Sequence, residues 1–425
     1  MQINRNEIEI MAPVGSFESL TAAIQAKADA VYFGAGNLNM RSNSSTNFAL
    51  NDLENIANIC KKNNIKSYLT LNTVIYDEDI ANMKLMIDFA KSNEIDAVIA
   101  SDWAVIDYAR KQNVAVHCST QLNISNSYSL EYYAKFAEVI VLARELNLEQ
   151  VANIYNYIGE NQIKSPSGNL VRIEMFIHGA LCMAISGKCY LSLHEQNRSA
   201  NRGACVQVCR RSYRVTVDEK INDAGQEIER EEQLEIDNQY IMSPKDLCTI
   251  SFLDKVLRAG ARVLKIEGRG RSPEYVKRTV ECYSRAIDAI IANTYSGELI
   301  AELTAKLSEV FNRGFWDGYY LGRKLGEWSE RHSSSATKRK EFIGVGTNYF
   351  SRIGVGEFIV QTGELNVGDE VVIMGPTTGV LETTVMEIHD DSGSIECAKK
   401  GKLFAIPVPE KIRRNDKLYK LVSQP

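Results

Sequence analysis

Four of the nine cysteines lie in one segment of the chain, residues 178–211. They have the spacing C-x6-C-x15-C-x3-C, and the apolar residues between them are too few and too irregular for a core helix or strand. We therefore expect a loop that is held together by something other than hydrophobic burial. Cysteines gathered in a polar intracellular loop are more often metal ligands than disulfide partners. The four candidate ligands are Cys182, Cys189, Cys205 and Cys209.

The spacing also bears on the kind of metal centre. Zinc ribbons usually show two close C-x2-C pairs, and this segment has none. Wide, irregular spacings suit an iron–sulfur cluster bound by loops. Cys248, in SPKDLC at the expected start of a helix, is an alternative fourth ligand. Zinc and unpaired buried thiols remain the alternatives to a cluster.

Basic side chains accompany the cysteines. Residues 198–214 contain five arginines and no acidic side chain. Such a run is usually a solvated surface, but beside a cluster it could neutralise sulfur charge, hold a di-acid or bind phosphates in bidentate fashion. His178, just upstream of the first cysteine, could carry a proton or could be a structural histidine at a strand end. The five arginines are Arg198, Arg202, Arg210, Arg211 and Arg214.

The elements that position this segment alternate between strands and helices. Short apolar runs predict eight strands, and amphipathic stretches between them predict helices, the last two over 245–260 and 272–293. Strands that are buried on both faces, in βα alternation, suggest a (β/α)8 barrel. The strands are expected at 7–13, 30–34, 66–75, 97–102, 114–121, 139–146, 173–179 and 263–269.

In such a barrel, functional side chains gather at the carboxyl ends of the strands. The cysteine segment directly follows the seventh strand and therefore lies on this rim. Glu267 could act in catalysis or could form a salt bridge with Arg269 or Lys265. Other polar residues at the strand ends include Asn72, Gln121, Arg144 and His178.

Composition shifts divide the chain into three parts. Residues 1–295 are expected to form the barrel, including the cysteine-rich segment 178–214, and 296–340 a helical extension and linker. From 341 to 425, short β-runs broken by Gly and Asp predict a small C-terminal β-barrel.

Overall composition is that of an ordinary globular protein. The net charge of −5 gives no global nucleic-acid signature, so RNA binding would require local patches. Residues 1–10 lack a basic and apolar secretory signal, and no apolar run approaches the ~18 residues of a membrane span. An odd, unevenly spread set of cysteines argues against a secreted disulfide framework. We expect a cytoplasmic protein without membrane contact, and neither HExxH nor GxSxG peptidase motifs occur.

Several of these motifs together resemble peptidase family U32, the collagenase-like family. They are FIHGALCMAISGKCYLS, NRGACVQVCRRSY, IMSPKDL, LKIEGRGRSPEYV and FNRGFWDGYYLG, and MAPVGS and AVYFGAG near the start also match. The resemblance covers essentially the whole chain. The family includes RNA hydroxylation proteins and a ubiquinone-biosynthesis branch besides its first-named collagenases, and the length of this chain is most similar to that of the tRNA hydroxylation members.

The resemblance implies a 4Fe–4S cluster on Cys182, Cys189, Cys205 and Cys209, with Cys248 as the alternative to Cys209. It implies prephenate-dependent 5-hydroxylation of the wobble uridine (position 34) of tRNA, with a family paralogue as a further partner to test. In this hypothesis the small carboxylate cosubstrate is held by an anion clamp. The substrate-binding residues would be Arg144, Arg198, Arg202, Asn72 and Gln121, and the catalytic ones His178, Glu267 and Arg269.

Three other functions stay open beside this one. They are a collagenase-like peptidase, a hydroxylase of a cytidine in 23S ribosomal RNA, and a non-catalytic RNA-binding factor. The C-terminal β-region resembles the small barrel of translation factors, which suggests a lid that docks tRNA.

Overall fold

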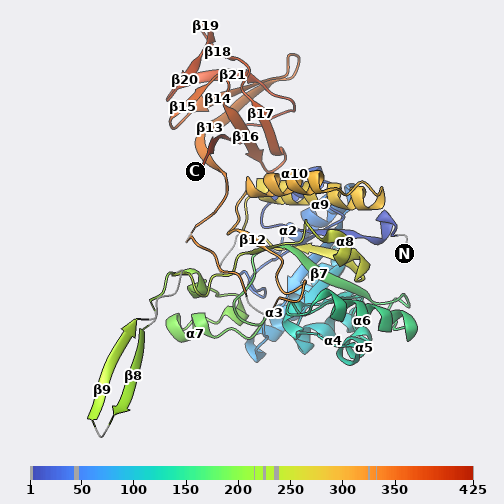
Figure 1. Ribbon diagram of the computed structural model, residues 1–425. Helices are drawn as coiled ribbons and strands as arrows, with labels where there is room; N and C mark the ends of the chain where they lie inside the picture. The colour runs from blue at the N-terminus through green and yellow to red at the C-terminus, as the bar shows by residue number, and fades with distance from the viewer. Residues whose placement is uncertain are drawn as a thin grey trace.

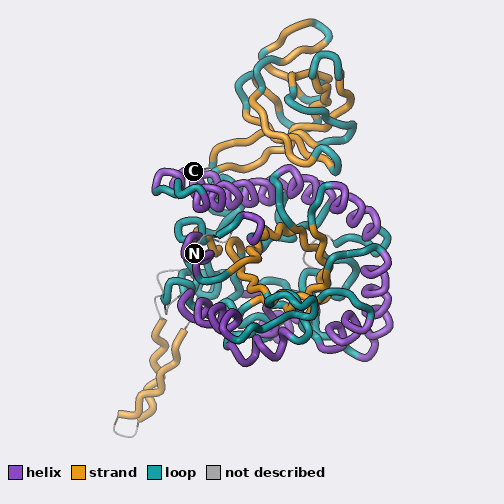
Figure 2. The backbone as a smooth tube through the Cα atoms, turned by 90° about the vertical axis from the view of Figure 1, so that its right-hand side faces the viewer, coloured by secondary structure: helices purple, strands orange, loops and turns teal. Residues whose placement is uncertain are grey.

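A computed structural model describes residues 3–42, 47–214, 216–223, 226–233, 239–323, 326–331 and 333–424. Eight parallel strands close into a barrel, in the order β11-β1-β2-β3-β4-β5-β6-β7, with β7 pairing back to β11 (Figure 2). All eight predicted strands are present, so the predicted barrel is confirmed. The strands are β1 (Glu9–Pro13), β2 (Ala30–Phe33), β3 (Lys66–Leu71), β4 (Ala97–Ala100), β5 (Val116–Cys118), β6 (Val139–Val141), β7 (Arg172–Gly179) and β11 (Ala261–Ile266).

Helices surround the barrel because the apolar stripe of each one packs on the outer face of the strands. Ser16 caps the first helix as its residue type predicts, since its side chain accepts a hydrogen bond from the Ser19 N–H. Within the described ranges, every helix falls short of the length and apolarity that a bilayer crossing requires. The helices are α1 (Phe17–Gln25), α2 (Asp52–Lys62), α3 (Ile80–Ser92), α4 (Trp103–Lys111), α5 (Ser127–Ala134), α6 (Leu148–Glu160), α8 (Leu253–Arg258) and α9 (Pro273–Ile291).

The helix predicted over 245–260 is wrong in its first half. Residues Asp246–Cys248 form a strand, β10, which runs antiparallel to the end of β7 and places Cys248 opposite His178. A two-residue strand, β12 (Phe315–Trp316), pairs with β10 on its other side. The long-range pairing of buried residues outweighs local helix propensity here. Helix α8 forms only after this strand.

The cysteine segment folds over the carboxyl ends of the strands with little regular structure. It contains one short helix, α7 (Leu191–Gln196), and two single turns at Ala200–Arg202 and Val208–Arg210. Its predicted loop character is therefore confirmed. A hairpin of β8 (Thr216–Asp223) and β9 (Gln226–Gln233) follows and projects away from the barrel (Figure 1), which the sequence patterns did not predict.

After the helix α10 (Gly297–Ser308), the regular elements of the C-terminal part are β-strands. Its main sheet has the antiparallel order β17-β16-β22-β13-β14-β21-β18-β19, and β15 pairs with β20 separately. This confirms the predicted β-domain, which begins with β13 at Lys338. The strands are β13 (Lys338–Phe350), β14 (Val355–Val360), β15 (Glu364–Asn366), β16 (Glu370–Gly375), β17 (Gly379–Thr384), β18 (Ile388–Asp390), β19 (Gly393–Ile395), β20 (Cys397–Lys399), β21 (Leu403–Pro407) and β22 (Lys417–Ser423).

The β-domain docks on the outer ring of helices (Figure 1). Val372, Met374 and Val380 pack against Ala22 of α1. The Gln25 side chain donates to the Thr378 carbonyl at 2.9 Å and accepts from the Val380 N–H at 3.0 Å. The domain is therefore held to the side of the barrel, and the pocket described below is lined by residues of the barrel and the cysteine segment.

Candidate metal centre and substrate pocket

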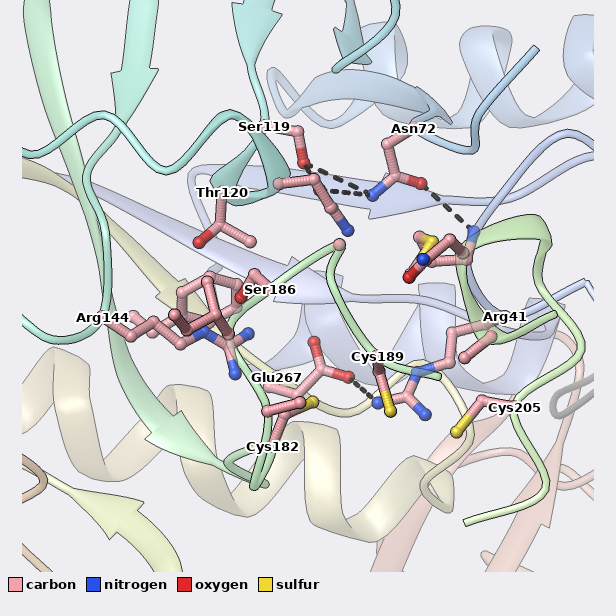
Figure 3. A pocket seen from close by; sticks show the side chains of 18 of the residues that line it. Arg41, Asn72, Ser119, Thr120, Arg144, Cys182, Ser186, Cys189, Cys205 and Glu267 are labelled. Carbon is pink, nitrogen blue, oxygen red and sulfur yellow. Dashed lines mark hydrogen bonds and ion pairs between the residues drawn. The ribbon is translucent and has the colours of Figure 1, made fainter. Parts of the chain in front are cut away.

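A pocket opens at the carboxyl ends of the barrel strands, beneath the cysteine segment (Figure 3). It gathers residues from most of the strand ends, as the rim argument predicts. Of the residues proposed from the sequence, the pocket is lined by Asn72, Gln121, Arg144, Glu267, Arg269, Cys182, Cys189, Cys205 and Cys209.

The four cysteines all line this one pocket, and none forms a disulfide. Cys182 is exposed, and the other three are half-buried. Burial raises the pKa of the Cys209 thiol above its ordinary value, and Cys182, Cys205 and Cys189 add to that rise. The four cysteines therefore lie within electrostatic range of one another.

The donors that a metal centre in this pocket would use are four thiols. Among the described residues, no group of three or more Cys, His, Asp or Glu side chains lies close enough together, as placed, to hold a metal ion. Tetrahedral zinc would hold its sulfurs about 3.8 Å apart, as Zn–S bonds of about 2.3 Å require. A cubane cluster spaces its four thiolates more widely because each binds a different iron. Four free thiols line this cavity, and four is the number of thiolates that a cubane cluster binds.

Three features fix the cysteine segment to the barrel. Gly203 has a φ of 82°, and an added Cβ would lie 2.0 Å from Ser42 Oγ, so only glycine permits this close approach. Arg202 donates to Asp79 Oδ2 at 2.6 Å and lies 3.8 Å above the Tyr76 ring. The Val74 N–H also donates to the Asn201 carbonyl at 3.1 Å. The segment is thus anchored between the loops that follow β2 and β3.

The centre of the pocket holds an ion pair between Arg41 and Glu267, around which three of the cysteines lie (Figure 3). The nitrogen–oxygen distance is 2.9 Å. Burial alone would raise the pKa of Glu267, but Arg41, Arg144 and Arg269 outweigh it and lower the pKa to about 2. Glu267 is therefore ionised at every physiological pH. The prediction that it pairs with Arg269 or Lys265 is wrong, because Arg41 from the loop after β2 lies nearer.

The two basic residues that the sequence offered as partners have other contacts. Arg269 is buried and donates to Asn39 Oδ1 at 3.0 Å and Thr70 Oγ1 at 2.9 Å. Burial lowers the pKa of this guanidinium to about 10. Lys265 lies deeper in the barrel and donates to Glu174 Oε1 at 2.8 Å. Charged groups thus extend from the pocket into the barrel interior.

The opposite wall of the pocket presents amides and hydroxyls. The Asn72 side chain lies 3.4 Å from both Ser119 Oγ and Gln121 Oε1, and its own oxygen accepts from the Met40 N–H at 3.2 Å. Ser119 in turn hydrogen-bonds Gln121. These neutral donors and acceptors suit the edge of a heterocyclic base or a sugar. Asn72 and Gln121 therefore both line the pocket, and their role in binding a substrate stays a prediction.

Arg144 forms a third wall. Its guanidinium lies 3.9 Å from the centre of the Phe176 ring, and its Nε atom is buried without a hydrogen-bond partner. A stacked guanidinium with an unused donor can bind an anion or the carbonyl of a ligand. Of the three arginines proposed as an anion clamp, this is the one that lines the pocket.

The remaining predicted residues lie outside the pocket lining. His178 is buried beneath β10, where its ring contacts Tyr275, Tyr283 and Phe315. Burial lowers its pKa to about 3, so it stays neutral, and it is not among the residues that line the pocket. These surroundings favour a structural role for His178 over a role as a proton carrier.

Arg198, Arg202 and Cys248 also lie away from the pocket. Arg198 is exposed at the end of α7, and Arg202 is engaged by Asp79. Cys248 is buried in β10, and the Tyr283 hydroxyl lies 3.8 Å from its sulfur. Burial raises the pKa of the Cys248 thiol to about 11. Its surroundings are those of a core residue.

The sequence patterns missed Arg41. It follows the short strand β2 in a long stretch without apolar periodicity, residues 35–50. A long loop after a barrel strand lies on the functional rim and often carries function. Loop length was therefore the available signal, whereas the pairing with Glu267 depends on the fold.

Comparison with known proteins places these features in a family. The family model for peptidase family U32 matches residues 15–330, which cover the barrel from α1 onward and the cysteine segment. The chain belongs to peptidase family U32. A protein named collagenase from Porphyromonas gingivalis (strain ATCC BAA-308 / W83) is 57% identical over 98% of this chain and 99% of its own length.

Other members of family U32 carry names from RNA modification. The tRNA hydroxylation protein P1 of Bacillus subtilis (strain 168) is 30% identical over 91% of this chain and 88% of its own length. The 23S rRNA 5-hydroxycytidine C2501 synthase of Escherichia coli (strain K12) is 31% identical over 76% of this chain and 47% of its length. Members named as a collagenase and as RNA-modifying proteins both support an enzymatic role for this U32 chain.

Proposed function

We propose that this protein is an RNA hydroxylase that modifies the wobble uridine (position 34) of tRNA. The observation that carries the proposal is the gathering of Cys182, Cys189, Cys205 and Cys209 around one rim pocket. These cysteines would hold a 4Fe–4S cluster, with a small carboxylate, prephenate by family resemblance, as cosubstrate. A bound cluster would supply redox or Lewis-acid chemistry at the pocket.

The chain's own residues supply binding and orientation. A base must leave its stack to be modified, and the pocket beneath the cysteine segment can receive it. The amide group of Asn72, with Gln121 and Ser119, can hydrogen-bond the edge of a pyrimidine, while Arg144 faces it with an unused N–H donor. Arg41 and Glu267 hold each other and keep fixed charges beside the cysteines.

The likeness to the collagenase from Porphyromonas gingivalis favours a second candidate, a peptidase. A serine or cysteine peptidase needs a base within hydrogen-bond reach of its nucleophile. Serines and cysteines line the pocket, but its described lining includes no histidine, and His178 and His117 are both buried. This arrangement supports the hydroxylase proposal over the peptidase.

Nucleoside mass spectrometry of tRNA tests the proposal. The gene would be deleted in its host and restored as wild type, as Cys182→Ala, or as Cys60→Ala, a cysteine in the core of α2. Hydroxylated uridine should be absent in the deletion and in Cys182→Ala, and present with wild type and Cys60→Ala. Unchanged tRNA in the deletion strain, together with gelatin cleavage by purified metal-free protein, would favour the peptidase instead.

A further inference from the structure

A second cavity shares cysteines with the pocket described above and is lined by four arginines. Cys182, Cys205, Cys209 and the Arg41–Glu267 pair line both this cavity and the pocket described above. Its remaining basic lining residues are Arg210, Arg271 and Arg313. We call this space the arginine chamber. The sequence analysis named Arg210 only as a member of the acid-free run and did not name Arg271 or Arg313.

One of these arginines has unused hydrogen-bonding capacity. Arg313 is 8% exposed, and its Nε atom has no hydrogen-bond partner. The half-buried Arg271 has its guanidinium carbon 3.5 Å from the centre of the Phe311 ring. Leaving the buried Nε of Arg313 without a partner costs free energy, which a ligand that accepts its hydrogen bond would offset. Arg210 differs, because it is fixed by the Leu181 and Pro244 carbonyls.

The charges in the chamber are unbalanced. Glu267 offsets Arg41, and Asp246, at 3.5 Å from Arg313, offsets that residue. Arg210 and Arg271 then contribute two positive charges that no described carboxylate contacts. These two arginines line one cavity together with Arg41 and Arg313, so four guanidinium groups lie close together there. The thiolates of the cysteine centre would offset part of this charge, and an incoming anion would offset more of it.

We propose that the arginine chamber binds a small oxyanion, a carboxylate or a phosphate, beside the cysteine centre. Guanidinium groups bind both in bidentate fashion. Arg271 packs on the Phe311 ring and lines the chamber, and a guanidinium that packs on an aromatic ring can still use its N–H groups for such recognition. The idea that this anion belongs to a co-reactant rests on the proposed function. The binding of an anion in the chamber does not depend on that function. The substrate base and the co-reactant would then approach the cysteine centre from two sides.

Calorimetric titration of anaerobically purified protein with phosphate and, separately, with malonate tests the proposal. At least one anion should bind wild type, and Arg271→Gln should weaken that binding by about tenfold or more, as loss of a charge-assisted hydrogen bond predicts. Arg271→Lys should recover part of it. Arg258→Gln, an exposed residue of α8 paired with Asp254, is the matched control and should bind as wild type does.

The outcomes distinguish a carboxylate ligand from a phosphate ligand. They also distinguish anion binding from a role of the arginines in supporting the cysteine centre alone. Preference for malonate assigns the chamber to a carboxylate, and preference for phosphate assigns it to a phosphate group. If neither anion binds, or if Arg271→Gln binds as wild type does while losing iron, the arginines serve only the cysteine centre and the proposal is refuted. Because titration does not involve RNA, failure of the tRNA assay would leave this result unaffected.

Discussion

Replacing Glu267 by Gln tests how far the pocket depends on its central ion pair. The substitution keeps the shape of the side chain but leaves Arg41 without its carboxylate partner. The pair is mostly buried, since 25% of the Arg41 side chain and 15% of the Glu267 side chain are exposed. The fall of the Glu267 pKa from 4.5 to about 2 is caused by surrounding guanidinium groups that outweigh burial. At about 1.36 kcal/mol per pH unit, the carboxylate contributes roughly 3 kcal/mol of folding free energy, and we expect Glu267→Gln to lose about 2–3 kcal/mol.

The pH dependence has a definite sign. A carboxyl whose pKa is lowered in the folded state stabilises the protein above its unfolded-state pKa, and that contribution is lost as pH falls through the folded value. The difference between wild type and Glu267→Gln should therefore be complete at neutral pH. It should shrink as pH falls from about 4.5 toward about 2. Urea unfolding, followed by fluorescence across this pH range, measures it.

Glu302 provides a matched control. Its pKa is also lowered to about 2, by hydrogen bonds to Arg285 and Lys306, but the group is on the surface. Exposed ion pairs contribute little to stability, so Glu302→Gln should change the unfolding free energy far less. Equal effects of the two substitutions, or a Glu267→Gln effect that does not change with pH, would refute the reasoning.

Three further predictions concern the cysteines, the anchor and the domain contact. Cys209→Ala should lose iron while Cys248→Ala retains it, as iron analysis of anaerobic preparations would show, and the reverse would make Cys248 the fourth ligand. Arg202→Ala removes the 2.6 Å contact to Asp79 and should speed tryptic cleavage within 191–214. The urea midpoint should stay nearly unchanged. Equal cleavage rates in the variant and wild type would show that this contact does not anchor the segment. Gln25→Ala removes two hydrogen bonds to the β-domain and should weaken its docking by about 1–2 kcal/mol. Faster proteolysis between α10 and β13 would show this weakening. Unchanged proteolysis would mean that apolar packing alone holds the domain.

Much of the fold could be predicted because its patterns are local. The eight barrel strands are short runs buried on both faces, and such runs can be recognised without knowing their partners. The stretch 245–260 failed for the opposite reason. Its first residues form β10 only because β7 is beside them, and no local pattern carries that information.

The candidate site divides in the same way. The cysteines could be identified because residue type and spacing reveal ligands, and the strand ends located Asn72, Gln121 and Arg144. Pairings could not be predicted, because they depend on three-dimensional proximity. Arg41 reaches Glu267 across the barrel mouth, and the acid-free arginine run is divided among carbonyls, carboxylates and solvent once the segment folds.

Iron and sulfide analysis of anaerobically purified protein, with its visible spectrum, tests the central claim most directly. The four-cysteine centre predicts about four irons per chain and a broad absorption near ~400 nm in wild type. Both should be lost in Cys182→Ala and retained in Cys60→Ala. A colourless, iron-free wild-type protein, or a Cys182→Ala variant with unchanged iron, would contradict the assignment of these cysteines as cluster ligands.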